Sequence, residues 1–462
     1  MAGIGFELQR VLRKGGIGSF VQVAFAGVII VAGPWLLSIV GIFAITRLAS
    51  AALEEGPRLF VSIVVYSYAW ALILFSGFHY LFTRIVADQI YEEKPAEAGA
   101  TLAVFSGAVV LIATLIAWFA ARHMEVGYLT RPELFRVSAA ALFPAINLLW
   151  IMMLFVSMLK RFGGIFFAYM GGMVISITGA IVLGRRMGLG GAMLGFTCGQ
   201  FAAALSLASL LLRKYRPAGF ARVPGIVARY FVRYRFLFFS GVLYYWGIWA
   251  DKVVMWITIG TAPAGTFMRL YDRYDIPVYL ASLTMIPGLV YFVVILETDF
   301  YLKLMRFLKE LQRGILRSVQ QRKYELIADM RRGLREQSMF QAVITVGLLL
   351  LAGTLLPSLG FSGVSETTFR ILLAAVYFHF TFLTLLTFLF YMEVYTHAAF
   401  ASLVFFLINL GVSIALVAAG RQELQGLGYL AGGVAGSAVA FYFLDTLVRR
   451  IDRLVLARYS EG

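Results

Sequence analysis

The sequence predicts an all-α, polytopic membrane protein with about 12 transmembrane helices in two six-helix bundles. Of its 462 residues, 61% are hydrophobic and only 14% are charged, whereas a soluble protein of this length needs more polar residues to cover its surface. Apolar runs of about 18 residues or more, long enough for a helix to cross a bilayer, recur from end to end. The short alternating segments of a membrane β-barrel are absent from the sequence.

The chain begins with a short amphipathic segment, residues 1–17. Apolar side chains recur there at helical spacing, opposite the basic residues Arg10, Arg13 and Lys14. This pattern is typical of a helix that lies on the cytoplasmic surface of a membrane. We expect no cleavable signal peptide, because Glu7 interrupts the segment and no small-residue cleavage site follows it.

Residues 18–212 are predicted to form the N-terminal six-helix bundle. The first span contains Gly33 and Pro34, and the proline is expected to bend the helix because it removes a backbone donor. Only residues 185–189 separate the last two spans. The predicted spans are 18–46, 59–86, 100–121, 134–159, 163–184 and 190–212.

The middle of the chain, residues 213–235, is strongly basic and contains no acidic residue. This stretch is predicted to be a cytoplasmic hinge between the two bundles. Residues 236–447 are predicted to form the C-terminal bundle, and a basic cytoplasmic tail, residues 448–462, follows it. The predicted spans of this second bundle are 236–260, 276–298, 339–357, 368–392, 398–419 and 426–447.

A long loop within the second bundle, residues 299–340, alternates basic and apolar residues. It is predicted to form an amphipathic helix at the cytoplasmic surface, where each basic charge near anionic lipid contributes about 1 kcal/mol. The loop is expected to dock anionic lipids or a soluble partner through four basic residues: Arg313, Arg317, Arg322 and Lys323.

The distribution of basic residues predicts the orientation of the chain. The segments on the side of both termini hold 28 Lys and Arg residues, and those on the other side hold 11. Because the cytoplasmic side retains basic residues, both termini are predicted to be cytoplasmic, and nucleic acid is not needed to explain the net charge of +16. Each half has six predicted spans, an even number, so both halves enter the membrane from the same side. If the two halves are structural repeats, they are parallel, and we expect a pseudo-two-fold axis along the membrane normal to relate them.

Asp251 and Lys252 are the charged pair inside a predicted span. Charges at that depth cost several kcal/mol, so they are expected to face a polar path or partners on other helices. Neighbours in sequence point about 100° apart on a helix, so we do not expect the two side chains simply to pair with each other.

The densest polar segment is residues 267–300, and we predict that it lines the substrate path. It leads into a span that Asp275 is expected to cap, with Pro277 in the first turn, and Pro287 is expected to kink the middle. Carboxylates beside tyrosine rings suit sugars, although a salt-bridged outer cap or an interfacial aromatic belt would also explain part of the pattern. The predicted path residues here are Arg269, Asp272, Arg273, Asp275, Tyr279, Glu297 and Asp299.

The sequence carries no pattern that indicates catalysis or a bound cofactor. Its four histidines lack metal-ligand spacing, and phosphate-binding or dinucleotide glycine motifs are missing. His379 in a span fits an interhelical hydrogen bond better than an intramembrane acyltransferase. The single cysteine, Cys198, forms no intrachain disulfide. We therefore expect a protein that is not an enzyme and holds no metal or cofactor.

Four stretches resemble one known family: MAGIGFEL at the N-terminus, GPW in the first span, RLYDRYDIP…ETDF at 269–300, and FLFYMEVYTHA at 388–398. They are similar to PelG, the inner-membrane transporter of Pel exopolysaccharide systems in Gram-negative bacteria. The resemblance implies a fold of the multidrug/oligosaccharidyl-lipid/polysaccharide exporter superfamily and export of a partly deacetylated amino-sugar polymer. It also implies a cytoplasmic glycosyltransferase (PelF) and the membrane scaffold proteins PelD, a cyclic di-GMP receptor, and PelE as partners. Glu393, in the last stretch, joins the predicted substrate path.

Together these observations predict an inner-membrane translocase that exports an amino-sugar exopolysaccharide to the periplasm for a biofilm matrix, within a synthase complex. Two alternatives stay open: a cation-coupled small-molecule exporter on the same fold, and a scaffold subunit that conducts nothing. A coupled exporter needs a membrane carboxylate that titrates or binds Na⁺, and Asp251 is the clear candidate within a span.

Overall fold

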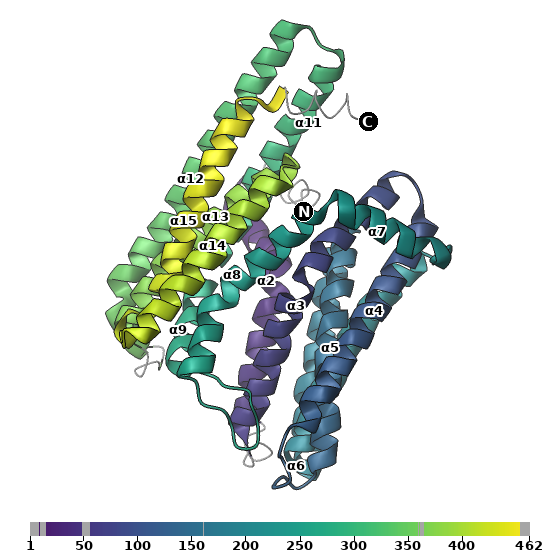
Figure 1. Ribbon diagram of the computed structural model, residues 1–462, viewed down its shortest axis with the longest axis vertical. Coiled ribbons are helices and arrows are strands. Elements are labelled where there is room, and N and C mark those ends of the chain that lie inside the picture. The colour runs from purple at the N-terminus through teal and green to yellow at the C-terminus, as the bar shows by residue number, and fades with distance from the viewer. Residues whose placement is uncertain are drawn as a thin grey trace. The chain divides into compact units, whose positions relative to one another are not determined.

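The computed structural model describes residues 15–48, 56–159, 161–358 and 365–452, together with Gln9 and Gly360 (Figure 1). The predicted surface helix at 1–17 and the tail at 448–462 therefore lie mostly outside the described residues. Contacts group the chain into two compact units, which are described separately below. We call Ala32–Trp249 with Met255–Tyr271 the N-terminal unit, and Met1–Val31 with Ala250–Val254 and Asp272–Gly462 the C-terminal unit.

Two helices pass from one unit to the other. Helix α2, Ile17–Leu48, does so between Val31 and Ala32, directly before Gly33 and Pro34. Helix α8, Arg235–Thr258, belongs to the N-terminal unit except for the segment that carries Asp251 and Lys252. It stays a prediction that residues 213–235 are a hinge between the two bundles. The bend at Pro34 also stays a prediction.

The N-terminal unit is built from long helices, several of which begin with a proline in the first turn. Proline is tolerated there because the first amides of a helix have no partner within the helix. Three helices start in this way: α3 (Pro57–Tyr91), α4 (Pro95–Arg122) and α5 (Pro132–Met158). The unit continues with α6 (Phe162–Lys214), the short helix η2 (Phe220–Arg222) and α7 (Val223–Arg233).

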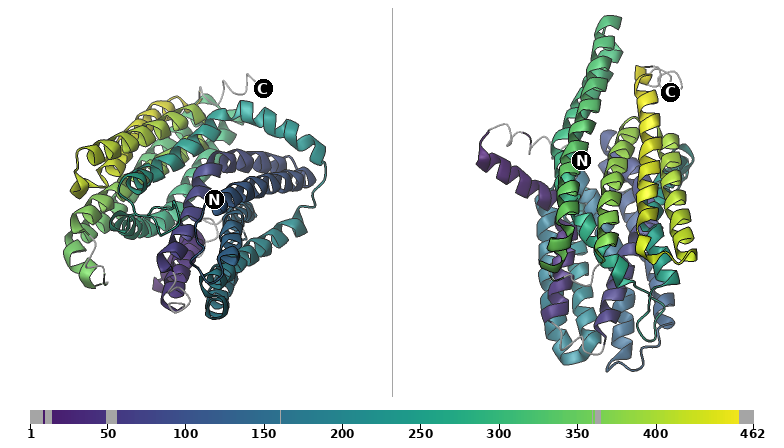
Figure 2. Two further views of the ribbon diagram at one scale, coloured as in Figure 1. Left: turned by 60° about the horizontal axis from the view of Figure 1, so that its bottom comes forward. Right: turned by 90° about the vertical axis from the view of Figure 1, so that its left-hand side faces the viewer.

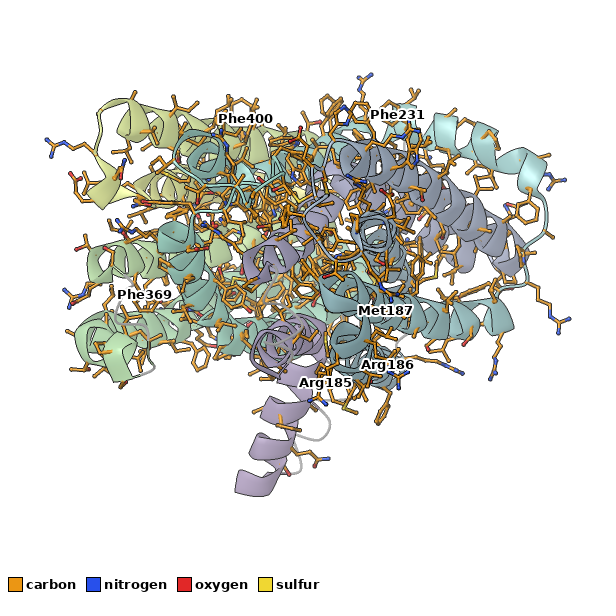
Figure 3. The ribbon with its side chains drawn as sticks, turned by 90° about the horizontal axis from the view of Figure 1, so that it is seen from below. Arg185, Arg186, Met187, Phe231, Phe369 and Phe400 are labelled. Atoms are coloured by element: carbon orange, nitrogen blue, oxygen red, sulfur yellow. The ribbon has the colours of Figure 1, made fainter. Side chains whose placement is uncertain are left out.

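Helix α6 is two spans joined by a sharp break at Gly188, whose φ of 63° favours glycine. The two arms lie backbone to backbone, since a Cβ on Gly179 would come within 2.9 Å of the Cα of Gly195. Arg185 and Arg186 are exposed at the break, where Figure 3 shows them beside Met187. The prediction of two spans separated only by residues 185–189 is therefore confirmed.

The basic stretch after α6 is helical and packs on the ends of α3 and α4 within the N-terminal unit. Tyr230 of α7 donates a hydrogen bond to Asp88 at 3.1 Å, and Arg222 forms an ion pair with Glu97 at 3.2 Å. Burial, with the charge of Asp88 adding to it, raises the pKa of Tyr230 to about 12. Sequence reasoning did not anticipate this docking, because the residues that receive it lie more than a hundred positions away.

The C-terminal unit contains a helical hairpin and a bundle of three helices. The hairpin consists of α11 (Glu297–Arg313) and α12 (Leu316–Ser358), and it projects past the ends of α13 and α14 (Figure 2, right). The bundle consists of α13 (Glu366–Tyr391), α14 (Tyr395–Ala418) and α15 (Leu427–Val448), with the short helix η4 (Gln422–Leu424) between the last two. Glycines at the start of α15 bring it close to α14, since a Cβ on Gly432 would lie 2.8 Å from the carbonyl of Phe405.

The predicted single span at 276–298 is interrupted. It consists of α9 (Asp272–Leu283), α10 (Ile286–Tyr291) and one π-helical segment, η3 (Phe292–Leu296), before α11 begins. Pro287 lies in the first turn of α10, directly after the break. Because α9 starts at Asp272, the expectation that Asp275 caps the helix with Pro277 in its first turn is wrong. Pro277 instead lies inside α9, where it has no N–H to donate to the carbonyl of Arg273, four residues before it.

Among the described residues, nine helices are long and apolar enough to cross a membrane. The nine include α6 once, although its break makes it two spans, and they do not include α2 or α8. Helices α2 and α8 each have at least 24 residues. When they are added and α6 is counted as two spans, the total agrees with the predicted 12. The predicted fold class is thus confirmed, and the chain is a multi-pass membrane protein.

Candidate functional site

A buried polar centre surrounds Asp251 in the C-terminal unit. Asp251 is fully buried and Lys252 is 8% exposed, on the segment of α8 that belongs to this unit. Tyr274 of α9 donates a hydrogen bond to one carboxylate oxygen of Asp251, and Asn409 of α14 donates to the other at 3.2 Å. Donors from two other helices thus hold the carboxylate, as buried charges require.

Lys252 also turns back toward its neighbour. Its Nζ lies 3.4 Å from each carboxylate oxygen of Asp251, and 4.7 Å from the ring centroid of Tyr429 on α15. The expectation that these two residues do not pair is wrong, because the four-carbon stem of lysine is long enough to fold back along the helix. The expectation of partners on other helices was correct for Asp251.

A second layer of polar groups supports this centre. Ser413 donates to the amide oxygen of Asn409 at 3.2 Å, and the hydroxyl of Tyr429 lies 2.7 Å from Nδ1 of His379. His379 therefore makes the interhelical hydrogen bond that was favoured over a catalytic role. Sequence reasoning missed Asn409, although the polar residues at positions 409 and 413 are one helical turn apart in an apolar span, which was a usable signal.

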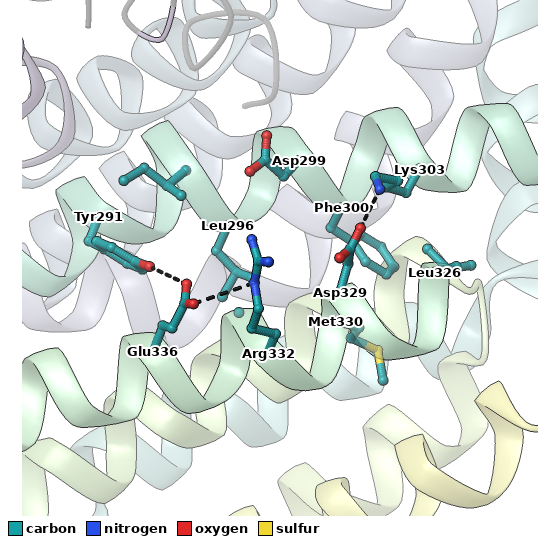
Figure 4. A pocket seen from close by; sticks show the side chains of 12 residues that line it. Tyr291, Leu296, Asp299, Phe300, Lys303, Leu326, Asp329, Met330, Arg332 and Glu336 are labelled. Atoms are coloured by element: carbon teal, nitrogen blue, oxygen red, sulfur yellow. Dashed lines mark hydrogen bonds and ion pairs between the residues drawn. The ribbon is translucent and has the colours of Figure 1, made fainter. Parts of the chain in front are cut away.

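A charged cavity of about 320 Å³ lies between η3, α11 and α12, at the base of the projecting hairpin (Figure 4). Apolar walls include Phe300 and Leu296. Gly333 lets α12 approach closely here, because a Cβ at that position would collide with Leu296. The polar lining consists of Tyr291, Asp299, Lys303, Asp329, Arg332 and Glu336.

Most charges around the cavity interact with one another. Lys303 forms an ion pair with Asp329, and Glu336 accepts from Tyr291 at 3.3 Å and pairs with Arg332 at 3.4 Å (Figure 4). Asp299 accepts a hydrogen bond from Gln9 at 2.8 Å through one of its two oxygens. Three carboxylates face two cations, so the lining carries a net negative charge.

Glu297 lies between the cavity-lining residues Leu296 and Asp299 along the chain but is not part of the lining. It is 3% exposed and accepts a hydrogen bond from Tyr391, the last residue of α13, at 2.5 Å. Two residues further on, Glu393 forms the turn between α13 and α14 with a φ of 54°, which is strained for a residue with a side chain. Glu297 and Glu393 therefore lie on the two segments that the Tyr391 hydrogen bond links.

A buried polar stripe runs along α12 from the cavity toward the break in the α9–α10 segment. Gln337 donates to Thr384 of α13 at 2.6 Å, and Gln341 donates to the carbonyl of Thr284, within the break, at 3.1 Å. Thr345 continues the stripe one turn later and is also buried. Sequence reasoning missed this stripe, because single polar residues at helical spacing do not stand out in a long amphipathic segment.

The remaining predicted path residues lie in different surroundings. Asp272 and Arg273 are exposed at the start of α9, and Asp275 and Tyr279 are half-buried along it. Arg269 belongs to the N-terminal unit, where its guanidinium donates to the carbonyl of Ile257 at 2.7 Å. The structure thus brings Asp251 and Lys252 together in one centre and places Asp299 in the cavity. A role for any of these residues in transport stays a prediction.

The predicted docking residues are not equivalent. Arg322 pairs with Glu325 on α12 at 2.7 Å, and Lys323 pairs with Asp452 at 2.7 Å. Arg317 is exposed near the tip of the hairpin, while the side chain of Arg313 lies outside the described part. Among the described residues, no group of three His, Cys, Asp or Glu side chains is placed to hold a metal ion.

Similarity to solved structures shows which fold the chain has. A mutant of the Vibrio cholerae MATE transporter VcmN matches with a TM-score of 0.60 at 12% identity, covering 96% of this chain and 98% of that one. MATE in the bent conformation matches with a TM-score of 0.59 at 11% identity and 98% coverage of both chains. The lipid II flippase MurJ, in an inward closed conformation, matches at 0.54 with 14% identity, covering 96% and 93%. The fold is therefore that of MATE-type membrane transporters.

A family match then identifies the chain more closely. The PelG family model, described as "Putative exopolysaccharide Exporter (EPS-E)", matches residues 1–456. No curated protein matches the sequence. The chain belongs to the PelG family, as its sequence stretches predicted.

Proposed function

We propose that the protein is a non-enzymatic translocase that exports an amino-sugar exopolysaccharide across the bacterial inner membrane for a biofilm matrix. Membership of an exopolysaccharide exporter family and a transporter fold support export in general. The observation that supports this substrate class is the charged cavity at Asp299. The excess of basic residues on the predicted cytoplasmic side supports the orientation with both termini in the cytoplasm.

The chemistry of the cavity suits a partly deacetylated polysaccharide. Its net negative charge attracts the ammonium groups of free amino sugars, while Lys303 and Arg332 carry more N–H donors than their ion pairs use and can donate to hydroxyl oxygens. Phe300 presents an aromatic wall of the kind that the C–H faces of sugar rings contact. A volume of about 320 Å³ lies at the small end of ligand pockets, so the cavity suits a short piece of a chain.

The location of the cavity supports a role at the cytoplasmic mouth of the path. It lies on α12 before the predicted span at 339–357, at the base of the basic hairpin. From there, the stripe of Gln337 and Gln341 provides polar groups toward the helix break before Pro287. We propose that the polymer follows this series of polar groups, that the π-helical segment and Pro287 let the helix adjust, and that Gly33 and Pro34 are a second hinge.

Neutralising one cavity charge is expected to reduce export without reducing the amount of protein. Asp299→Asn removes a charged contact worth about 1.5 kcal/mol or more, so secretion should fall about tenfold. The control is Glu325→Gln, which removes an acid from the same hairpin outside the cavity. Polymer secretion and membrane abundance are measured in cells whose own copy is deleted. Equal secretion by the two variants at equal abundance would show that the cavity is not part of the substrate path.

We also propose that the hairpin docks the cytoplasmic glycosyltransferase, a PelF-like protein, beside PelD-like and PelE-like scaffolds, with anionic lipid as the alternative ligand. Because Arg322 and Lys323 hold internal ion pairs, the exposed Arg306, Lys309 and Arg317 are better probes. Reversing these three charges should abolish co-purification of the transferase, whereas Arg185→Glu with Arg186→Glu should not. Retained co-purification in high salt would leave lipid attraction as the role of these charges.

A further inference from the structure

We propose that the Asp251 centre is a monovalent-cation site whose occupant is the ammonium group of the protein's own Lys252. The Nζ atom lies 3.4 Å from both oxygens of Asp251 and over the ring of Tyr429, so a carboxylate and an aromatic face contact it together. Both are ligands that a small cation prefers. Asp251 is completely buried, which makes it a site that is closed to bulk water.

The surrounding groups hold the carboxylate of Asp251 in place. The ammonium group of Lys252 occupies the position of the cation beside it. Tyr274 and Asn409 each donate a hydrogen bond to Asp251, one to each carboxylate oxygen, and so fix the orientation of the carboxylate. Ser413 fixes the amide of Asn409 in the orientation that directs its NH₂ group at Asp251. His379 lies beyond Tyr429 and is hydrogen-bonded to it. The contacts described for the centre thus pair one carboxylate with one ammonium group.

The charge balance decides between two modes of transport. Adding Na⁺ to a centre that already contains Lys252 would leave a net positive charge buried among membrane helices, which costs several kcal/mol. Asp251, the residue that a cation-coupled exporter would require, is thus already neutralised within the chain. The inference does not rest on the proposed substrate, because its test measures stability rather than export.

Removing the lysine should convert the closed pair into a site for an added cation. In the purified full-length protein, Lys252→Ala leaves a cavity beside Asp251, and ammonium, K⁺ or Na⁺ should raise its melting temperature by about 2–4 °C over choline at equal ionic strength. Choline is too large to enter. The matched control is the double variant Asp251→Asn with Lys252→Ala, which has the same cavity without the carboxylate and should show no response.

The wild-type protein supplies an independent readout. Its melting temperature should be the same in Na⁺, K⁺ and choline, because its site is occupied. A sodium-dependent rise in the wild type that Asp251→Asn removes would overturn the proposal, since it would show that the carboxylate binds an external cation beside Lys252. A folded Lys252→Ala variant that no small cation stabilises would overturn it as well. If Lys252→Ala cannot be purified, Lys252→Ser, which leaves a similar space beside Asp251, is tested in the same buffers.

Discussion

Asp251→Asn is expected to destabilise the protein by about 3–5 kcal/mol, the largest single effect that we expect from a change of charge. The variant keeps the shape of the side chain but leaves the ammonium of Lys252 buried beside a neutral amide. Removing one partner of a buried pair costs this much because the other charge stays in a low-dielectric environment. We therefore expect low abundance in the membrane and a lower melting temperature, with export lost as a consequence.

A double-mutant cycle separates this cause from a loss of shape. Adding Lys252→Met to Asp251→Asn removes the second charge, so most of the lost stability should return. The surface control is Glu423→Gln, which breaks an exposed ion pair with Arg421 and should leave the melting temperature unchanged. If Asp251→Asn alone is as stable as the wild type, the ion pair does not hold this centre together.

Gly428→Val is expected to disrupt the packing of α15 on α14 and the Asp251 centre with it. A Cβ at position 428 would collide with Ser413 and lie 2.8 Å from the carbonyl of Asn409. A backbone atom cannot move aside as a side chain does, so the two helices must separate. Overpacking of this kind costs about 1–3 kcal/mol, and a further loss is expected because Asn409 would be displaced from Asp251.

The matched control for this prediction is Gly411→Val. Gly411 lies on α14, and nothing is found within 4 Å of a Cβ added there. Both changes replace a glycine within a helix by the same β-branched residue, and they differ in the space around the new side chain. Melting temperatures of the purified proteins should differ by several degrees. Similar values for the two variants would mean that the close approach of α14 and α15 does not limit stability.

The sequence was sufficient to predict the helices and the family, because both can be recognised from short stretches of neighbouring residues. Long apolar runs located the spans, including both arms of α6, where one glycine with a positive φ makes the break at position 188. The family stretches at 269–300 and 388–398 predicted the PelG match.

The candidate site was less predictable, because its contacts join distant residues. Asn409 reaches Asp251 across 158 positions, and Tyr274, one of the tyrosines that an interfacial belt would also explain, is completely buried against that carboxylate. The π-helical segment at 292–296, which lies against α12, cannot be recognised from the composition of the sequence. The docking of α7 onto α3 and α4 has the same origin, since only the folded chain brings Tyr230 to Asp88.

Polymer transport into inverted inner-membrane vesicles is the measurement that tests most directly whether the protein is the translocase. Vesicles that contain the synthase, with or without this protein, are supplied with labelled sugar nucleotides, and the polymer protected from an added glycosidase is counted. We predict that protected polymer accumulates only when the protein is present and that Asp299→Asn lowers it about tenfold. Equal protection in vesicles that lack the protein would contradict its assignment as the translocase.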